Sequence, residues 1–479
     1  MNMTSFPVKE VTFFIIMLTA LQFHPVEIQH RAIFLPYLMK NSQTCDRAFT
    51  NVFCWQHLFR TQWAEANDFL IIRAYINGER RAAYLIVSRE ETPSYSDIIP
   101  LMEADAANLD QPLTLMGLSE TECDELEQQF PGQFFFDRNR DFADYVYRAE
   151  DLRTLSGRKY AQKRNHVNKF KSLYSYHYEA ITAENINDCR QLEESWISQH
   201  HEDESAQSEY LTIQSAFQHF EELNLFGGTL YVDGKLVAFT YGSAIRDDIF
   251  CTHVEKADIQ YEGVYQMINY LFAQHLPEQY TFINREEDMG LAGLRKSKTS
   301  YHPAHLAYKA TALKLNDEMR DIIHIWKNSF GEADSSINTF LSRYYFDHCT
   351  MVEKIDGHVV SMVFMIPCQT PFGLAAYLYG IATLPEYRRQ GISSKLIHQM
   401  LEKCRQNGAV FAFLIPEDEE LKDYYAKFGY LRTQTNAIFE SDMDLGTGNT
   451  KKDRIMILPF DESFQIEKLS DTLECRPML

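Results

Sequence analysis

Three two-residue turn signals, each set between apolar runs, constrain the fold of this chain more than any other sequence feature. They are Asn77-Gly78, Asp233-Gly234 and Asp356-Gly357. Such a dipeptide between apolar runs predicts a β-hairpin. Each of the last two hairpins follows an amphipathic helical stretch and precedes another apolar strand, a turn and a helix. This recurrence favours related domains in tandem, with helices layered over a central sheet.

The length sets the number of domains. The chain has 479 residues, which is too many for one hydrophobic core. We therefore expect an α+β (α/β layered) protein with mixed central sheets flanked by helices. Its predicted segments are 1–16, a possible non-native N-terminal extension, followed by 17–150, 151–310 and 311–479.

The N-terminal apolar run Val11–Leu21 is too short to cross a membrane, because a spanning helix needs about 20 residues. The segment before it has only Lys9 beside Glu10, unlike the basic start of a secretory signal. We expect Met17 to be the true start, a first strand soon after it, no integral membrane segment and a cytoplasmic location. Nine scattered cysteines without a CxxC pair indicate reduced thiols and no metal site.

The charge of the chain limits its partners. A formal net charge of −21 repels phosphate backbones at long range, so nucleic-acid contact would need a local basic patch. The stretch 153–171 holds seven Lys/Arg and no acid, and predicts a helix from about Lys159. One reading is a phosphate-rich partner such as tRNA or a phospholipid headgroup, contacted at Lys163 and Arg164. The other is a solvated helix paired with neighbouring acids.

A strand-to-helix junction in the last third favours an anion. An apolar strand over 375–383 precedes an amphipathic helix, and the junction between them is Arg388-Arg389-Gln390-Gly391-Ile392-Ser393. Gly391 lets the backbone curl so that successive N–H groups converge. The helix that begins there adds unpaired N–H groups and a positive dipole end. These six residues therefore form a predicted pyrophosphate site.

The junction resembles the pyrophosphate-binding segment of GCN5-related N-acetyltransferases, Gln/Arg-x-x-Gly-x-Gly/Ala. Arg388, Gly391 and Ser393 occupy its three fixed places, and Ser393 departs from the usual Gly or Ala. The resemblance implies that 311–479 is an acyl-CoA-dependent N-acyltransferase with acetyl-CoA as co-substrate and an unidentified amine as acceptor. It also implies that the preceding strand, through the Ile381 amide and Thr383, holds the pantetheine arm and the thioester carbonyl.

A second element of the same family follows. Residues 417–431, EDEELKDYYAKFGYL, resemble its strand-following helix, which ends in Tyr-x-x-Phe-Gly-Tyr/Phe. By that match Tyr425 is the candidate general acid, protonating the departing CoA sulfur. The alternative is that Tyr425 only packs the helix. No general base is identified; Glu353 and Glu386 are candidates, and each also reads as a solvated surface carboxylate.

Residues 253–303, together with the stretch GRKYAQKRNHVNKF, resemble the C-terminal domain of phosphatidylglycerol lysyltransferases, over roughly 24–308. That domain is two acyltransferase-like folds in tandem, so the resemblance implies three GNAT-like copies in this chain. In membrane-bound relatives it uses an aminoacyl-tRNA donor and a lipid acceptor. The counterpart of the pyrophosphate loop, 260–265, ends in bulky Tyr265, so we do not expect CoA there.

A polar cluster after residue 283 is the predicted second site. In a cleft it could hold a zwitterionic amino acid, the carboxylate on Arg295 or Lys298 and the amine on an acid. An internal salt-bridge network is the alternative. With the two cations of the basic stretch, the predicted residues are Lys163, Arg164, Glu286, Asp288, Arg295, Lys298 and Tyr301.

Three hypotheses for the whole chain follow from these features. The first is N-acylation of an amine from acetyl-CoA in 311–479. The second places aminoacyl transfer from tRNA in 151–310. The third makes 1–310 a non-catalytic module that recruits a substrate.

Overall fold

The computed structural model describes residues 20–40, 42–76, 81–198, 203–346, 348–440, 445, 454–460, 464 and 466–478. The predicted start at Met17, the apolar run up to residue 19 and the Asn77-Gly78 turn lie outside them. The chain forms two compact units. Unit 1 comprises 1–109 and 113–312, and unit 2 comprises 110–112 and 313–479.

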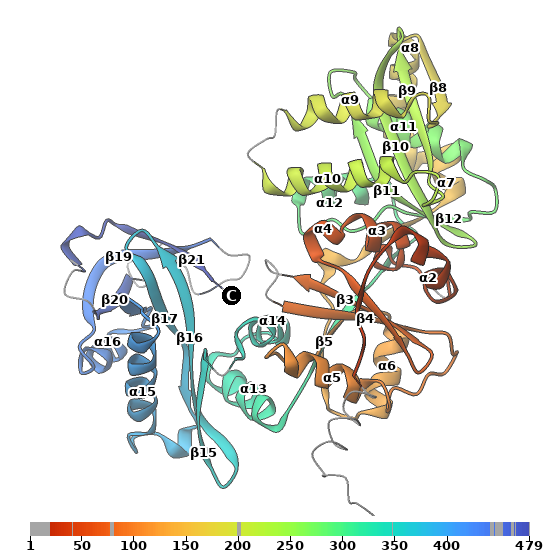
Figure 1. Cartoon of the computed structure of the whole chain (residues 1–479). Coiled ribbons are helices and arrows are strands. Elements are labelled where there is room, and N and C mark those ends of the chain that lie inside the picture. Colours follow the sequence, from red (N-terminus) through yellow and green to blue (C-terminus); the bar gives the residue numbers. More distant parts are fainter. Residues whose placement is uncertain are drawn as a thin grey trace, which may run out of the picture. The chain divides into compact units, whose positions relative to one another are not determined.

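Each of three mixed seven-stranded sheets carries helices on its faces (Figure 1), which confirms the predicted fold class. The first sheet has the order β1 (His24–Pro25), β2 (Gln62–Ala66), β3 (Phe69–Ile76), β4 (Arg81–Ser88), β5 (Thr114–Leu118), β14 (Ala310–Lys314) and β6 (Phe134–Asp137). Its helices are α2 (Arg31–Leu38), α3 (Phe49–Cys54), α4 (Gln56–Phe59), α5 (Ile99–Asn108) and α6 (Glu120–Gln129).

The second sheet completes unit 1. Its order is β13 (His305–Ala307), β7 (Asp144–Arg148), β12 (Phe282–Asn284), β11 (Ile249–Ala257), β10 (Lys235–Arg246), β9 (Phe226–Val232) and β8 (Tyr176–Ala180). Its helices are α7 (Ala149–Thr154), α8 (Ala161–Leu173), α9 (Ile186–Ile197), α10 (Glu204–Gln218), α11 (Val264–His275) and α12 (Ala292–Thr299).

The third sheet belongs to unit 2. Its order is β15 (Thr350–Ile355), β16 (His358–Thr370), β17 (Gly373–Thr383), β18 (Phe411–Leu414), β20 (Arg454–Pro459), β19 (Leu431–Phe439) and β21 (Thr472–Pro477). Its helices are α13 (Asp317–Phe330), α14 (Asp334–Tyr344), α15 (Ile392–Gln406) and α16 (Glu419–Ala426).

The predicted hairpins are confirmed where the structure describes them. β9 pairs with β10 across Asp233-Gly234, and β15 pairs with β16 across Asp356-Gly357. Both residues of each turn have positive φ, at 49° and 79° in the first and 53° and 87° in the second. A two-residue turn of this hand matches the strand twist, and aspartate and glycine tolerate it best. β3 and β4 also pair as predicted, up to Ile76 opposite Arg81.

Packing joins the two sheets of unit 1. One core cluster combines residues of the first sheet, such as Trp63 and Leu85, with Phe239 and Tyr241 of β10. In unit 2, Val363 and Met365 of β16 face α15, whereas Phe364 packs on Trp326 of α13. Because side chains alternate along a strand, α13 and α15 cover opposite faces of that sheet.

Two further observations bear on the sequence predictions. All nine cysteines are free and buried. Within the described residues, no helix combines the length and the apolar character that crossing a bilayer requires.

Candidate functional site

The sheet of unit 2 opens beside β17. β17 pairs with β16 as far as Thr383 opposite Ser361, but with β18 only from Ala375 to Tyr377. Beyond Tyr377, β17 therefore has no strand pairing with β18 among the described residues. We call this opening the notch.

A bulge lies in β17 at the notch. Its pairing with β16 passes from Tyr379 opposite Phe364 to Ala382 opposite Met362, so β17 has one extra residue there. Gly380, with φ 58°, supplies the left-handed backbone at this place. A bulge leaves a backbone group outside the ladder. The predicted amide donor, Ile381, belongs to this bulged segment.

The predicted pyrophosphate junction is a bend and not continuous helix. A 3-10 turn at Pro385–Tyr387 precedes it, and α15 begins only at Ile392. Gly391 is the N-cap, with φ 80° and no side-chain capping bond. The first amides of α15 have no partner within the helix, so they point together into the bend. A methyl group on Gly391 would meet no atom within 4 Å, which leaves the space over the bend open.

The corresponding bend of unit 1 is closed. Gly263 caps α11 with φ 83°, as Gly391 caps α15. A methyl group on Gly263, however, would lie 2.7 Å from the carbonyl oxygen of His166 in α8. The backbone of α8 therefore occupies the space that a phosphate would need, in addition to the bulk of Tyr265. An anion fits the residues at Gly391 and does not fit those at Gly263.

The other junction residues are partly engaged. Arg388 Nε donates to the Thr383 carbonyl at 3.0 Å, which holds the guanidinium at the end of β17. Thr383 Oγ1 lies 2.8 Å from Ser361 Oγ and is buried. Arg389 and Gln390 are exposed, and Gln390 Nε2 donates to the Glu386 carbonyl at 3.1 Å. Of the two base candidates, Glu353 is paired with Lys395 at 2.8 Å and Glu386 is exposed.

Two neighbouring tyrosines of α16 have different surroundings. Tyr425 is 7% exposed, in the core with Leu396 and Ile397, and burial raises its pKa. Tyr424 is half-buried, and its hydroxyl lies 3.1 Å from Ser394 Oγ at the start of α15. Sequence matching selected Tyr425. The structure places the hydroxyl of Tyr424 nearer to the predicted pyrophosphate junction.

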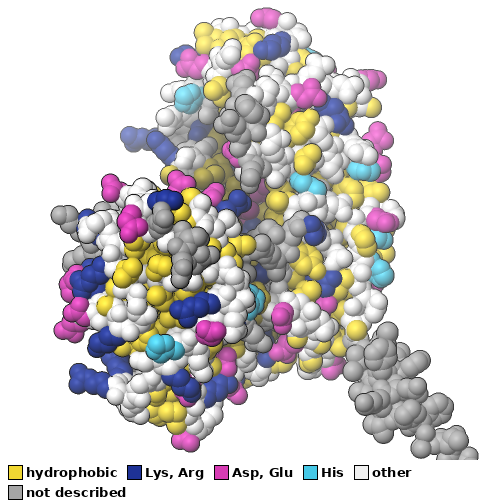
Figure 2. Space-filling model, turned by 60° about the vertical axis from the view of Figure 1, so that its left-hand side comes forward, with side chains coloured by type: hydrophobic (Ala, Val, Ile, Leu, Met, Phe, Trp, Pro, Cys, Tyr) yellow, Lys and Arg dark blue, Asp and Glu magenta, His cyan; other side chains and the backbone are white. Residues whose placement is uncertain are grey.

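The surface gives little electrostatic guidance. In the view of Figure 2, basic and acidic side chains lie interspersed. The net charge of −21 therefore does not translate into a single-sign face there. Recognition has to be argued from local groups.

In unit 1, two of the residues predicted for a second site, Asp288 and Arg295, belong to a network around the Asp288 carboxylate. Asp288 is fully buried, and its carboxylate accepts from Arg295 at 2.7 and 2.9 Å, Arg140 at 3.0 Å and Tyr145 at 2.5 Å. These partners, Arg295 first, hold the pKa of Asp288 well below its usual range. Arg295 also lines an open hollow of about 660 Å³ beside α12. The contacts match an internal salt-bridge network.

The remaining predicted cations also contact the chain itself. Lys298 Nζ donates to the carbonyl of Arg285 at 2.6 Å, and Arg164 donates to that of Gly157 at 2.6 Å. Lys163 lies 4.0 Å over the ring of Tyr301. Lys169 of the basic stretch pairs with Glu262 at 2.6 Å. Of these residues of 153–171, only Lys169 has the acidic partner that the solvated-helix alternative expects, whereas Lys163 contacts a ring and Arg164 a backbone carbonyl.

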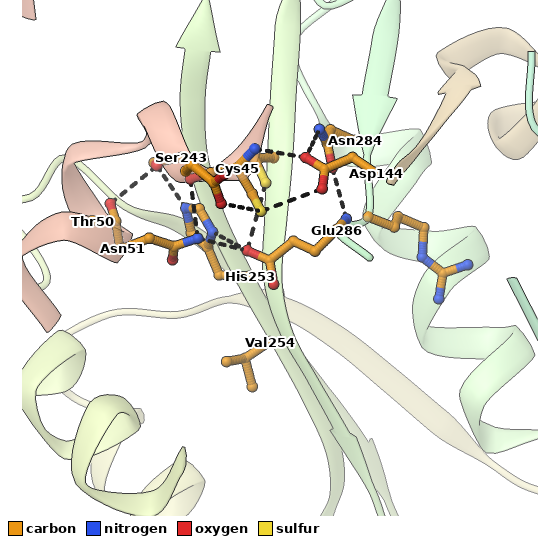
Figure 3. Close-up of polar contacts among 12 residues, drawn as sticks. Cys45, Thr50, Asn51, Asp144, Ser243, His253, Val254, Asn284 and Glu286 are labelled. Atoms are coloured by element: carbon orange, nitrogen blue, oxygen red, sulfur yellow. Dashed lines mark hydrogen bonds and ion pairs between the residues drawn. The ribbon is translucent and has the colours of Figure 1, made fainter. Parts of the chain in front are cut away.

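A hydrogen-bonded relay that sequence reasoning missed ends on Glu286 (Figure 3). Thr50 donates to Ser243 at 3.0 Å, Ser243 Oγ lies 2.8 Å from His253 Nε2, and His253 Nδ1 lies 3.0 Å from Glu286 Oε1. Asn51 also donates to Glu286 Oε1, at 2.9 Å. Ser243 and Thr50 are buried, so the chain of contacts orients the Glu286 carboxylate rather than presenting a nucleophile.

The relay and the notch share one arrangement of strands, a short parallel pairing followed by a register shift. β11 pairs with β12 only as far as Cys251 opposite Asn284, and a register shift follows, at His253. Gly242, which pairs with Thr252 beside this shift, has to be glycine, because a methyl group on it would lie 1.9 Å from the Cys251 carbonyl oxygen. A glycine within an apolar strand, which indicates a bulge in the neighbouring strand, is therefore the sequence signal that could have pointed to His253.

Beside the relay lies a buried cluster around Lys309. Its Nζ contacts Asp144 at 2.9 Å, Glu287 at 3.0 Å and Cys45 Sγ at 3.4 Å. Burial raises the pKa of Asp144 and that of the Cys45 thiol, which stays protonated. Two sets here bring possible metal-ligand atoms within 4.8 Å of one another: Cys251/His253/Glu286 and Cys45/Asp144/Glu287. In both sets hydrogen bonds or ion pairs already engage these atoms; Cys251 Sγ donates to Glu286 Oε1 at 3.8 Å.

Comparison with known proteins agrees with this architecture. The profile of the family "phosphatidylglycerol lysyltransferase, C-terminal" matches residues 39–312, more than half of the chain. The chain belongs to this family. The profile of the acetyltransferase (GNAT) domain matches residues 312–432 and confirms the resemblance to GCN5-related N-acetyltransferases. Together the two matches support acyl transfer, to nitrogen in unit 2, as the general chemistry.

Similar proteins of known structure or sequence span the family part. A conserved protein of unknown function from Bacteroides thetaiotaomicron is 36% identical, with a TM-score of 0.59, over 62% of this chain and 100% of its own. L-PGS from Bacillus licheniformis is 16% identical, with a TM-score of 0.45, over 65% of this chain and 99% of its own. An uncharacterised protein of Mycoplasmoides gallisepticum is 27% identical over 217 residues, 43% of this chain and 67% of its own.

Proposed function

We propose that unit 2 is an N-acetyltransferase that transfers the acetyl group of acetyl-CoA directly to an amine. The observation that carries this proposal is the open bend at Gly391, whose left-handed backbone and uncapped helix start fit a pyrophosphate. Acetyl-CoA would supply the activated thioester. Arg388 to Ser393 would bind its pyrophosphate, and β17 at the notch would hold its pantetheine arm.

Two further residues of the proposal would stabilise the developing negative charge and supply a proton to the leaving group. The amide of Ile381, in the bulge, would donate to the oxygen on which negative charge develops, and such a donor is worth about 10²–10³ in rate. Tyr425 would protonate the leaving sulfur. Its buried phenol carries the proton at neutral pH, as an acid must. The acceptor is an amine whose identity the chain does not specify.

A thiol-release assay tests the proposal. The full chain is mixed with acetyl-CoA and, in turn, with polyamines, free amino acids and peptides, and the released thiol is measured. We expect at least one amine to release thiol faster than buffer does. Thiol release with none of them, from a chain that also fails to bind acetyl-CoA, would contradict the proposal.

A matched pair of variants assigns the activity to the bend. Gly391→Asp and Gly391→Asn have nearly the same shape, and both residues tolerate positive φ. Only the aspartate repels phosphate, by about 4 kcal/mol for unit charges 4 Å apart near a protein surface. Allowing for screening, we expect Gly391→Asp to raise the KM for acetyl-CoA at least about tenfold more than Gly391→Asn. Equal effects of the two variants would place the cofactor elsewhere.

Family membership favours a second candidate function for unit 1. The family is named for a phosphatidylglycerol lysyltransferase, which makes aminoacyl transfer from tRNA the alternative for 151–310. Filter binding of charged tRNA at two salt concentrations checks it, with steep salt dependence expected. Binding that does not change with salt would count against it.

A further inference from the structure

Two cations of unit 1 share one aromatic ring. Lys163 Nζ of α8 lies 4.0 Å from the centre of the Tyr301 ring, and the guanidinium carbon of Arg285 lies 5.0 Å from it. Tyr147 of β7 packs edge-on against Tyr301, with the ring centres 6.4 Å apart. Glu255 of β11 accepts a hydrogen bond from Asn269 of α11 at 3.3 Å and lies beside these groups. This group of side chains, which we call the Tyr301 subsite, comes from five separate parts of the chain.

Its charges do not balance. Glu255 accepts from Arg285 Nη2 at 3.2 and 3.3 Å and is the carboxylate that faces both cations. Arg285 is 12% exposed, and its Nη1 is buried without a hydrogen-bond partner among the described residues. Buried charged donors without an acceptor are rare because each forfeits its hydration. The Tyr301 subsite thus has one positive charge and one N–H donor in excess.

The lowered pKa of Lys163 shows the same excess of positive charge. Burial lowers its pKa to about 8, and the nearby Arg285 acts in the same direction. A half-buried ammonium beside a guanidinium is unfavourable, and Glu255, which acts in the opposite direction on the pKa of Lys163, does not cancel the effect. Lys171, on the same helix, lies 4.8 Å over the ring of Tyr270 but is exposed. The two lysines differ in burial and in the neighbouring arginine, and not in helix or in aromatic contact.

We propose that Lys163 and Arg285, over the ring of Tyr301, form a subsite for an oxyanion, a phosphate or carboxylate group of a small ligand. Lys163 Nζ and Arg285 Nη1 donate to it, while Glu255 keeps the guanidinium in place. The anion-binding arginine is then Arg285 and not Arg295, because the hydrogen bonds of Arg295 go to Asp288 and Asp141. It is independent of the acetyl-CoA proposal, which concerns unit 2.

The test follows the reactivity of single lysines in the full-length protein. The chain is acetylated briefly with an N-hydroxysuccinimide ester between pH 6.5 and 10, and modification of Lys163 and Lys171 is quantified by peptide mass spectrometry. Inorganic phosphate, acetate and chloride are compared at equal ionic strength. Because the readout belongs to Lys163, phosphate bound at Gly391 does not disturb it.

We expect the midpoint for Lys163 to lie near pH 8 in chloride and to rise by about one unit or more in phosphate, a tenfold protection, with Lys171 unchanged. A shift in phosphate alone identifies a phosphate site, and a shift in acetate as well identifies a carboxylate site. No shift in either anion, or an equal shift at Lys171, overturns the proposal.

A variant pair completes the test. Lys163→Gln should weaken phosphate protection of the protein against thermal unfolding in a Gly391→Asp background, and Lys171→Gln should not. Lys163 is half-exposed, so its replacement leaves the fold intact. Equal protection of both variants would contradict the subsite.

Discussion

At the scale of residues, the hydroxyls of Tyr424 and Tyr425 distinguish two roles on one helix. Tyr424 reaches Ser394 at the start of α15, whereas Tyr425 is buried among Leu396 and Ile397. A hydroxyl that contacts the pyrophosphate junction affects binding. A hydroxyl that donates a proton affects the rate of the chemical step.

Phenylalanine at each position separates these roles. We expect Tyr425→Phe to lower kcat by about 10²–10⁴ at unchanged KM for acetyl-CoA, since a positioned acid contributes that much. Tyr424→Phe should raise KM and leave kcat within about threefold, because a single neutral hydrogen bond is worth about 1 kcal/mol. Steady-state kinetics on both variants checks the prediction. The reverse pattern would make Tyr424 the acid.

Whether the role of a residue could be predicted depends on whether the residues that act with it are close to it in the sequence. The bend at Gly391 was predictable because six consecutive residues encode a turn, a helix start and two cations. The relay of Ser243, His253 and Glu286 was not, because its members come from three separate segments and meet only through a bulge. Arg285 lies in the polar cluster after residue 283, yet only the structure shows that one of its buried donors lacks an acceptor among the described residues.

At the scale of elements, α12 is anchored to β7 through one carboxylate. Asp288 accepts from Arg295 of α12, from Tyr145 of β7 and from Arg140. The mixed charges after residue 283 predicted either a ligand site or a salt-bridge network. The sequence could not decide between these alternatives, because two partners of Asp288, Arg140 and Tyr145, lie far from it along the chain. The network fixes how the chain leaves β12.

The anchor makes a pH-dependent prediction. The pKa of Asp288 is depressed in the folded state, so its contribution to stability is full above the unfolded value of about 3.9 and is lost as the pH falls through the folded value. We expect Asp288→Asn to cost about 3 kcal/mol at pH 7. The difference from wild type should be constant between pH 7 and 5 and shrink below about pH 4.

Urea unfolding at pH 7, 5 and 3.5 measures this difference. The control is Asp141→Asn, because Asp141 pairs with the same Arg295 at 2.5 Å but is 41% exposed. An exposed pair is worth less than about 1 kcal/mol. A loss at Asp141 as large as that at Asp288 would mean that burial does not set the strength of the network.

At the scale of the whole molecule, the hairpins and the amphipathic helices were sufficient to predict repeated α+β sheets. The shared core of unit 1 was not predictable, because alternation along β10 shows that a face is buried but not which helix or sheet covers it. Phe239 and Tyr241 of that strand pack in one cluster with Trp63 and Phe53 of the first sheet and its helices. The two halves of unit 1 therefore depend on each other.

Truncation tests this dependence. A fragment of residues 20–316 should fold cooperatively, since it keeps both sheets and the shared core. A fragment of 143–309, which keeps the whole second sheet, should be poorly soluble and bind a hydrophobic dye, because the surface around Phe239 and Tyr241 loses its cover. Circular dichroism with thermal unfolding compares the two fragments. A stable, dye-free 143–309 fragment would show that the halves are independent.

Calorimetric titration with acetyl-CoA tests most directly the proposal that the bend at Gly391 binds the pyrophosphate, whereas the one at Gly263 does not. Gly391 is uncovered, whereas the equivalent space at Gly263 is occupied by the backbone of α8. We expect one acetyl-CoA to bind per chain, with binding weakened at least about tenfold by Gly391→Asp and little by Gly391→Asn. No binding, or a second site that survives Gly391→Asp, would contradict it.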